Sequence, residues 1–167
     1  MGEQAVTRVG IGYDVHAFAA PEAQRPLMIG GVTIPHERGL AGHSDADALL
    51  HALVDALLGA AALGDIGTHF PSSDPRWRDA ASTVFLTHTL GLLTEQGWRI
   101  GNVDATIVAE RPRMTSHIPA IRMRLAETLG LQLEAVSVKA KTTDGLGFTG
   151  RSEGIACYAI VLIERDA

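Results

Sequence analysis

The stretch GYDVHAF, residues 12–18, closes a segment in which apolar side chains alternate with glycine and polar ones from Arg8 onward. Because successive side chains of a strand point to opposite faces, the alternation predicts a strand over residues 8–17. We expect one face to pack in the core, and it carries Val9, Ile11, Tyr13 and Val15. The other face carries Gly10, Gly12, Asp14 and His16. Its two glycines leave room for a ligand or another backbone, and its carboxylate and imidazole lie about 7 Å apart along the strand, close enough to share one ion.

The order of predicted elements favours a single α+β domain over residues 1–167. Strand patterns occur near residues 8–17, 100–110, 135–143 and 154–165, with a short hairpin strand near 27–34, and helix patterns occur near 45–60, 79–96 and 114–129. The last two helices are expected to end at Gly97 and Gly130, where a left-handed residue is favoured. Because helices and strands do not alternate strictly, we predict a mixed β-sheet with helices packed on one face. GIG at residues 10–12 lacks the third glycine of a dinucleotide-binding motif, and no helix follows it directly.

Composition indicates one folded globular domain and argues against binding to nucleic acid. Hydrophobic residues make up 46% of the 167 residues and charged residues 20%, which is typical of a globular protein. The net charge of -5 is the opposite of the basic surface that nucleic-acid binders carry. A phosphorylated small substrate remains compatible, because bound cations can supply positive charge. Cys157 is the single cysteine, so no internal disulfide framework is possible and a cytoplasmic location is expected.

The longest apolar run is IACYAIVLI, residues 155–163. It is far too short to span a bilayer as a helix, and the opening residues lack the apolar segment of a signal peptide, so we expect no association with membranes. The run is apolar on both faces, and strands of this kind are usually covered on both sides. Helices can cover one side, and a partner subunit is the expected cover for the other.

A second polar pattern lies in HSDADALLHALVDALLGAAALGD, residues 43–65. We predict that Ser44 caps the helix, with Asp47 in a position like that of a capping box. Asp47, His51 and Asp55 recur every four residues and form one polar stripe, so the two acids are candidates to orient the second nitrogen of His51.

Asp14, His16 and His51 together would offer one oxygen and two nitrogens, a ligand set that suits zinc and leaves one tetrahedral position open. Spacing alone also allows a surface histidine and a strand end that never meet. The N-terminus of the same helix attracts anions, which places a phosphate near His43 and Ser44; simple capping by Ser44 is the alternative.

These motifs resemble the 2-C-methyl-D-erythritol 2,4-cyclodiphosphate synthase family of the non-mevalonate isoprenoid pathway. The resemblance rests on GYDVHAF (12–18), GGVTIPHERGLAGHSDAD (30–47), LHALVDALLGAAALGDIGTHFP (50–71), GNVDATIVAERPRM (101–114) and TTDGLGFTGRSEGIA (142–156). It implies a phosphorus-oxygen lyase, in which the 2-phosphate of 4-diphosphocytidyl-2-C-methyl-D-erythritol 2-phosphate attacks the β-phosphorus. The cyclic diphosphate forms and CMP leaves. Since the nucleophile belongs to the substrate, the protein needs only to position it and to neutralise charge.

The resemblance also implies roles for individual residues. Asp14, His16 and His51 would bind one zinc ion per subunit, and His43 and Thr142 would stabilise the transition state. The positions implied to contact substrate are Asp14, His16, His43, Ser44, Asp65, Gly67, Asp74, Phe148 and Arg151. The segment Ala109–Thr115 would form the cytosine pocket, with Ala109, Pro112, Arg113, Met114 and Thr115. The remaining histidines, His36, His69, His88 and His117, receive no role.

The sequence departs from the usual family pattern in three places. Asp144 stands where a glutamate usually binds a second ion, Mg²⁺ or Mn²⁺, on the substrate diphosphate; its carboxylate is one methylene shorter. Ser72 and Ser73 precede Asp74 in a loop that usually carries one more carboxylate, and Tyr13 replaces a common phenylalanine.

The resemblance implies a homotrimer with active sites between neighbouring subunits. Two other functions remain open from the sequence. One is a metal-dependent hydrolase of nucleoside diphosphate compounds, with water as the nucleophile. The other is a trimeric binding module for isoprenoid diphosphates without catalysis.

Overall fold

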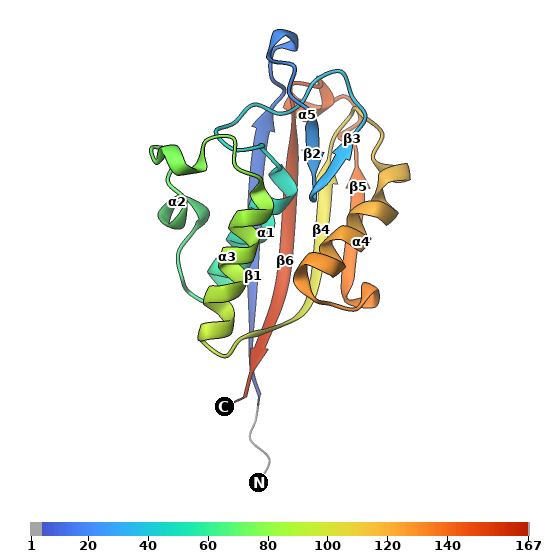
Figure 1. Ribbon diagram of the computed structural model, residues 1–167. Helices are drawn as coiled ribbons and strands as arrows, with labels where there is room; N and C mark the ends of the chain where they lie inside the picture. The colour runs from blue at the N-terminus through green and yellow to red at the C-terminus, as the bar shows by residue number, and fades with distance from the viewer. Residues whose placement is uncertain (1–4, 167) are drawn as a thin grey trace.

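Four strands form the main sheet in the order β1–β6–β4–β5 (Figure 1). The structure is a computed structural model that describes residues 5–166. The strands are β1 (Val6–Ala17), β4 (Arg99–Val108), β5 (Val136–Lys141) and β6 (Gly154–Arg165). Strands β1 and β4 both run antiparallel to β6, whereas β5 runs parallel to β4. The predicted mixed sheet is therefore confirmed.

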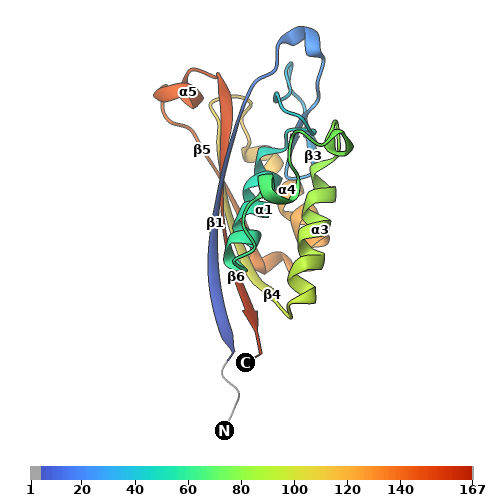
Figure 2. The same cartoon turned by 90° about the vertical axis from the view of Figure 1, so that its left-hand side faces the viewer.

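Three longer helices cover one face of this sheet, as predicted (Figure 2). They are α1 (Ala48–Ala60), α3 (Ser82–Glu95) and α4 (Ile118–Leu129). Helix α1 lies between the sheet and α3, and most of its side chains are buried for that reason. Among residues 5–166, no helix is long and apolar enough to cross a membrane.

Several short elements connect the longer ones. The hairpin β2 (Leu27–Ile29) and β3 (Val32–Ile34) forms a separate two-stranded sheet. The single-turn helices are α2 (Ile66–His69), α5 (Gly147–Gly150), η1 (Pro21–Ala23), η2 (Pro75–Trp77), η3 (Thr115–His117) and η4 (Leu133–Ala135). None of these single turns was predicted, because they are too short to show a periodic pattern.

The predicted start of helix α1 was wrong. Asp47, not Ser44, is the N-cap, and its carboxylate accepts a hydrogen bond of 3.0 Å from the N–H of Leu50. The same carboxylate accepts from the N–H groups of Gly30 and Gly31, at 2.8 and 2.7 Å, in the turn between β2 and β3. Both glycines have positive φ, as a two-residue hairpin turn requires. Asp47 is fully buried by these contacts, so it joins the hairpin to the helix.

Strand β1 packs directly against the backbone of α1. A Cβ added at Gly12 would lie 2.7 Å from the carbonyl carbon of Ala52 and 2.8 Å from the amide nitrogen of Ala56. A Cβ at Gly10 would lie 2.7 Å from the amide nitrogen of Ala60. The two glycines therefore admit another backbone, which is one of the two predicted possibilities. This close approach brings the start of α1 to the end of β1.

The predicted burial of the apolar face of β1 was wrong for the single chain. Val9 and Ile11 are 65% and 68% exposed, because α1, α3 and α4 all lie on the opposite face of the sheet (Figure 2). On β6 the apolar residues Tyr158 and Ile160 share this exposed face. The exposed apolar face of the sheet consists of Val9, Ile11, Tyr13, Val15, Tyr158 and Ile160.

Candidate metal centre

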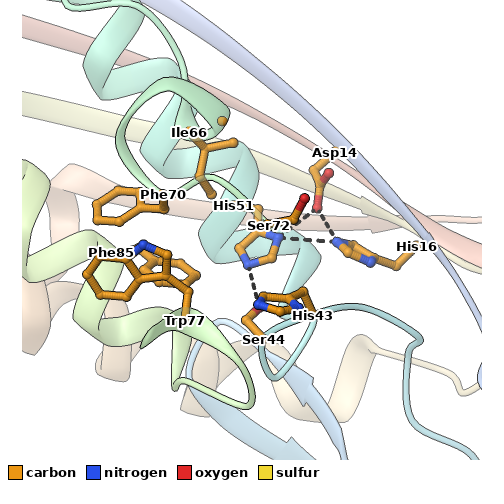
Figure 3. Close-up of a pocket in the computed structure, with 11 residues that line it drawn as sticks. Asp14, His16, His43, Ser44, His51, Ile66, Phe70, Ser72, Trp77 and Phe85 are labelled. Atoms are coloured by element: carbon orange, nitrogen blue, oxygen red, sulfur yellow. Dashed lines mark hydrogen bonds and ion pairs between the residues drawn. The ribbon is translucent and has the colours of Figure 1, made fainter. Parts of the chain in front are cut away.

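Asp14, His16 and His51 meet at the junction of β1 and α1 (Figure 3). Oδ2 of Asp14 lies 2.9 Å from Nε2 of His16 and 3.2 Å from Nδ1 of His51. The two imidazole nitrogens are 3.2 Å apart. The structure thus brings together the strand pair and the helical histidine that the sequence singled out separately.

The three atoms have the spacing that a tetrahedral metal site needs. Zinc bonds of about 2.0–2.2 Å to nitrogen and oxygen place neighbouring ligand atoms about 3.3–3.5 Å apart. The observed separations of 2.9 and 3.2 Å differ from this by only a few tenths of an ångström. All three side chains are partly shielded from solvent, yet they line a cavity, so a cation held by them remains accessible to a ligand. The triad can therefore hold a metal ion.

A backbone carbonyl orients the ring of His16. Its Nδ1 lies 2.6 Å from the carbonyl oxygen of Ala41, which can only accept a hydrogen bond. The proton of neutral His16 is therefore on Nδ1, and the lone pair of Nε2 points to Asp14 and His51. This is the tautomer that metal binding requires.

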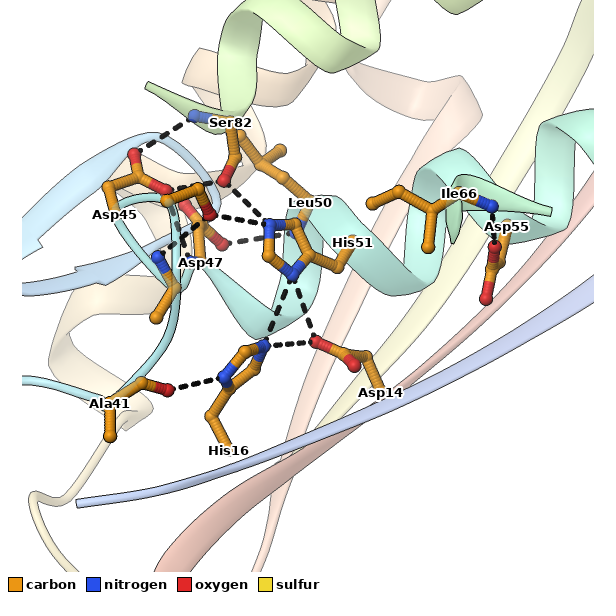
Figure 4. A network of polar contacts seen from close by, with 12 residues as sticks. Asp14, His16, Ala41, Asp45, Asp47, Leu50, His51, Asp55, Ile66 and Ser82 are labelled. Atoms are coloured by element: carbon orange, nitrogen blue, oxygen red, sulfur yellow. Dashed lines mark hydrogen bonds and ion pairs between the residues drawn. The ribbon is translucent and has the colours of Figure 1, made fainter. Parts of the chain in front are cut away.

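The predicted partners of His51 were wrong. Its Nε2 lies 2.8 Å from Oγ of Ser82 (Figure 4) and 3.2 Å from Oγ of Ser44 (Figure 3). Asp55 instead accepts a 2.7 Å hydrogen bond from the N–H of Ile66. The carboxylate of Asp47 accepts from the N–H of Gly30 in the hairpin turn. The sequence carried no signal for Ser82, which lies 31 residues beyond His51.

The electrostatics of the strand pair favour a positive charge beside Asp14. Burial alone would raise the pKa of Asp14, but the hydrogen bonds and charges of His16 and His51 outweigh burial and lower it. Burial would lower the pKa of His16, but the hydrogen bond and charge of Asp14 outweigh it and raise the pKa. Asp14 is therefore a stable carboxylate that prefers a neighbouring cation, either an imidazolium or a metal.

A cavity of about 270 Å³ opens beside the triad (Figure 3). His43 and Ser44, in the loop before α1, line it together with Gly67 and Ser72. The opposite wall is apolar and consists of Ile66, Phe70, Trp77 and Phe85. This wall was missed, since Ile66, Phe70 and Trp77 come from short segments without a periodic pattern, and nothing in the sequence indicated that they meet Phe85. The cavity can accept a ligand with both an anionic and an apolar part.

Other predicted site residues lie near this cavity without lining it. Asp65 is exposed and caps α2, with a 2.8 Å hydrogen bond from the N–H of Thr68. The carboxylate of Asp74 pairs with Arg76 at 2.6 Å. The backbone carbonyl oxygen of Asp74 lies 3.3 Å from Nε2 of His43.

A second group of predicted residues lies apart from the cavity of the same chain. It comprises Ala109, Pro112, Arg113, Met114, Thr115, Thr142, Asp144, Phe148 and Arg151, none of which lines that cavity. These residues follow β4 and β5 or precede β6, at the end of the sheet where β1 carries His16 (Figure 1). Thr142 donates a 3.2 Å hydrogen bond to Asp144, and Arg151 pairs with Glu153 at 2.8 Å. Within a single chain, the residues of the predicted cytosine pocket therefore do not line the cavity beside the predicted metal centre.

Comparison of the sequence with models of known protein families identifies the family of this chain. The model of the YgbB family matches residues 7–164, nearly the whole chain. The chain belongs to the YgbB family.

Two similar relatives carry the same name. The 2-C-methyl-D-erythritol 2,4-cyclodiphosphate synthase of Xanthomonas axonopodis pv. citri (strain 306) is 56% identical over 160 residues, which cover 96% of this chain and 95% of the relative. The protein of the same name from Thioalkalivibrio sulfidiphilus (strain HL-EbGR7) is 59% identical over 157 residues, covering 94% and 96%.

Solved structures agree with the fold. A 2C-methyl-D-erythritol-2,4-cyclodiphosphate synthase described as a CDP-bound form has a TM-score of 0.84 at 36% identity, covering 93% of this chain and 99% of that one. The bifunctional IspDF of Campylobacter jejuni has a TM-score of 0.91 at 38% identity, covering 97% of this chain but 43% of that longer one.

Proposed function

We propose that this YgbB family member is a zinc-dependent phosphorus-oxygen lyase. Its substrate would be 4-diphosphocytidyl-2-C-methyl-D-erythritol 2-phosphate, and its products 2-C-methyl-D-erythritol 2,4-cyclodiphosphate and CMP. Two relatives named for this product are 56% and 59% identical to the chain. The observation that carries the proposal is the convergence of Asp14, His16 and His51 beside a cavity that His43 and Ser44 also line.

Asp14, His16 and His51 are the residues that would hold zinc. When bound, zinc would supply positive charge to the diphosphate and help to orient it. Asp144 would contribute a carboxylate to a second ion, Mg²⁺ or Mn²⁺, on the same diphosphate. Asp144 is exposed and already close to the hydroxyl of Thr142, so both groups can act on one phosphate.

The remaining polar groups would position the reacting phosphates. His43 and Ser44 line the cavity beside the triad, where their side chains would donate hydrogen bonds to a substrate phosphate. Thr142 would donate a hydrogen bond to the transferring phosphoryl group from the other side. Asp65, Gly67 and Asp74 would contact the sugar and erythritol portions. Because attack comes from the substrate's own phosphate, correct placement of the two phosphates is the main work of these residues.

We further propose a cytoplasmic homotrimer, in which each active site lies between neighbouring chains. Within one chain, Ala109–Thr115, Thr142, Asp144, Phe148 and Arg151 do not line the cavity beside the triad. A neighbouring chain would bring its own copy of these residues to that cavity. The exposed apolar face of the sheet supports the assembly, because contiguous exposed apolar residues indicate a protein interface.

A phosphorus NMR time course on the proposed substrate tests this function. The expected result is a pair of signals from a cyclic diphosphate, formed together with CMP. Zinc removal should abolish turnover and zinc addition should restore it. His51→Ala should be inactive while its assembly by gel filtration matches that of the parent chain.

Running the reaction in ¹⁸O-labelled water separates this lyase from a hydrolase. Ring closure incorporates no solvent oxygen, whereas hydrolysis gives an open bisphosphate that carries ¹⁸O. An open, labelled product would assign the site to hydrolysis. No turnover with tight binding of isoprenoid diphosphates would indicate a binding module.

A further inference from the structure

Two residues behind the metal centre have no role in the function described so far. Ser82 is the first residue of α3 and is fully buried, and Asp45 lies in the loop before α1. Figure 4 shows both on the side of His51 that faces away from Asp14 and His16. We propose that Ser82 and Asp45 are positioning residues that fix the tautomer and ring orientation of His51 for metal binding. This inference rests on the proposed metal site.

The hydrogen-bond directions in this group follow from its acceptors. The carboxylate of Asp45 contacts the hydroxyl of Ser82, and it also accepts from the N–H of Ser82 at 3.1 Å and from that of Asp47 at 3.2 Å. An ionised carboxylate can only accept hydrogen bonds, so the hydroxyl of Ser82 donates to Asp45. Oγ of Ser82 then presents only lone pairs to His51.

The consequence for His51 is a single competent tautomer. Its Nε2 lies 2.8 Å from Oγ of Ser82, so Nε2 carries the proton and donates it. Nδ1 keeps its lone pair and faces Oδ2 of Asp14 and Nε2 of His16, each at 3.2 Å. Metal-binding histidines commonly need such a partner on the second nitrogen. Through Ser82, Asp45 thus determines that Nδ1, and not Nε2, is the nitrogen of His51 that is free to bind a cation.

Ser44 does not provide the same control. Its Oγ is farther from Nε2 of His51, at 3.2 Å, and accepts from the N–H of Ala46 at 3.2 Å. No carboxylate of residues 5–166 accepts a hydrogen bond from its hydroxyl, and Ser44 lines the cavity, where it can contact a ligand. Ser82 does not line the cavity, so its action on a ligand is indirect, through His51.

The chain offers variants that separate positioning from folding. Ser82→Ala removes the hydroxyl but keeps the N–H that Asp45 accepts at the start of α3. Thr89→Val is the matched control, because it removes another fully buried hydroxyl of α3, one that donates only to the carbonyl oxygen of Phe85. Asp45→Asn tests the same chain of hydrogen bonds without shortening a side chain.

The measurements are zinc affinity, by competition with a chromophoric chelator, and the ¹⁵N shifts of His51 in the zinc-free protein. We expect Ser82→Ala to raise the zinc dissociation constant about 10–100-fold, with a mixture of His51 tautomers. Asp45→Asn should act in the same direction and provides the test if Ser82→Ala does not fold. Thr89→Val should match the parent chain in both measurements.

Two different failures can be told apart. If His51→Ala abolishes zinc binding but Ser82→Ala and Asp45→Asn bind zinc like the parent, the positioning role is overturned and the metal site stands. If the parent chain does not bind zinc, or if His51→Ala binds it equally well, the proposed metal site is overturned and the positioning role with it.

Discussion

Replacing Gly12 by alanine should damage both the fold and the metal centre. The added Cβ would lie 2.7 Å from the carbonyl carbon of Ala52 and 2.8 Å from the amide nitrogen of Ala56, whereas ordinary contact begins at 3.4 Å. These neighbours are helix backbone and cannot rotate away, so α1 has to move off the sheet. Inserting a methyl group into packed structure costs about 1–3 kcal/mol, and we expect the upper end or more.

The same displacement should weaken metal binding, because His51 is the residue before Ala52 on α1. Any retreat of α1 carries Nδ1 of His51 away from the two ligands on β1, which are fixed by the sheet. We therefore expect Gly12→Ala to lower the free energy of unfolding in urea by about 3 kcal/mol and to lose zinc affinity together with it.

Gly91→Ala is the matched control for this prediction. Gly91 is an exposed residue inside α3, and a Cβ added there would have no neighbouring atom of residues 5–166 within 4 Å. The same chemical change should here stabilise the protein by about 0.5–1 kcal/mol, since alanine favours the helix over glycine. Both variants are compared with the parent at one protein concentration. A Gly12→Ala protein within 1 kcal/mol of the parent, with its zinc affinity intact, would refute the packing of β1 on α1.

Three further predictions follow from other parts of the fold. Asp47→Ala should lower the free energy of unfolding in urea by about 2–5 kcal/mol, because three backbone N–H groups lose their acceptor; a loss under 1 kcal/mol would contradict this. Burial raises the pKa of the Cys157 thiol well above its ordinary value, so a thiol reagent at pH 8 should label it only in denaturant. The unfolded thiol ionises near about 8.5 and the folded one does not, so this group's contribution to stability is lost as pH rises above that value, and Cys157→Ala should flatten this part of the pH dependence. Ile11→Asp should give monomers in sedimentation velocity, whereas Val84→Asp, at an exposed position of α3, should assemble like the parent; trimers of Ile11→Asp would count against the proposed interface.

Much of the fold was predictable because its elements follow simple periodicities. The last strand was predicted at residues 154–165 and is β6, Gly154–Arg165. The alternation in β1 showed two distinct faces correctly. It could not show which face the helices cover, because a glycine face that admits a helix backbone looks like an open surface in the sequence.

The start of α1 illustrates a second limit. Ser44 and Asp47 are both good capping residues, and local sequence does not choose between them. The choice falls on Asp47 because its carboxylate also binds the distant turn at Gly30 and Gly31. The partner of His51 was hidden for the same reason, since Ser82 reaches it only through tertiary structure.

Anomalous X-ray diffraction at the zinc edge, on crystals grown with zinc, shows whether Asp14, His16 and His51 bind a metal ion. We expect one peak per chain, at about 2.0–2.2 Å from Oδ2 of Asp14, Nε2 of His16 and Nδ1 of His51. A zinc ion bound elsewhere, with no peak among these three atoms, would overturn the proposed metal centre.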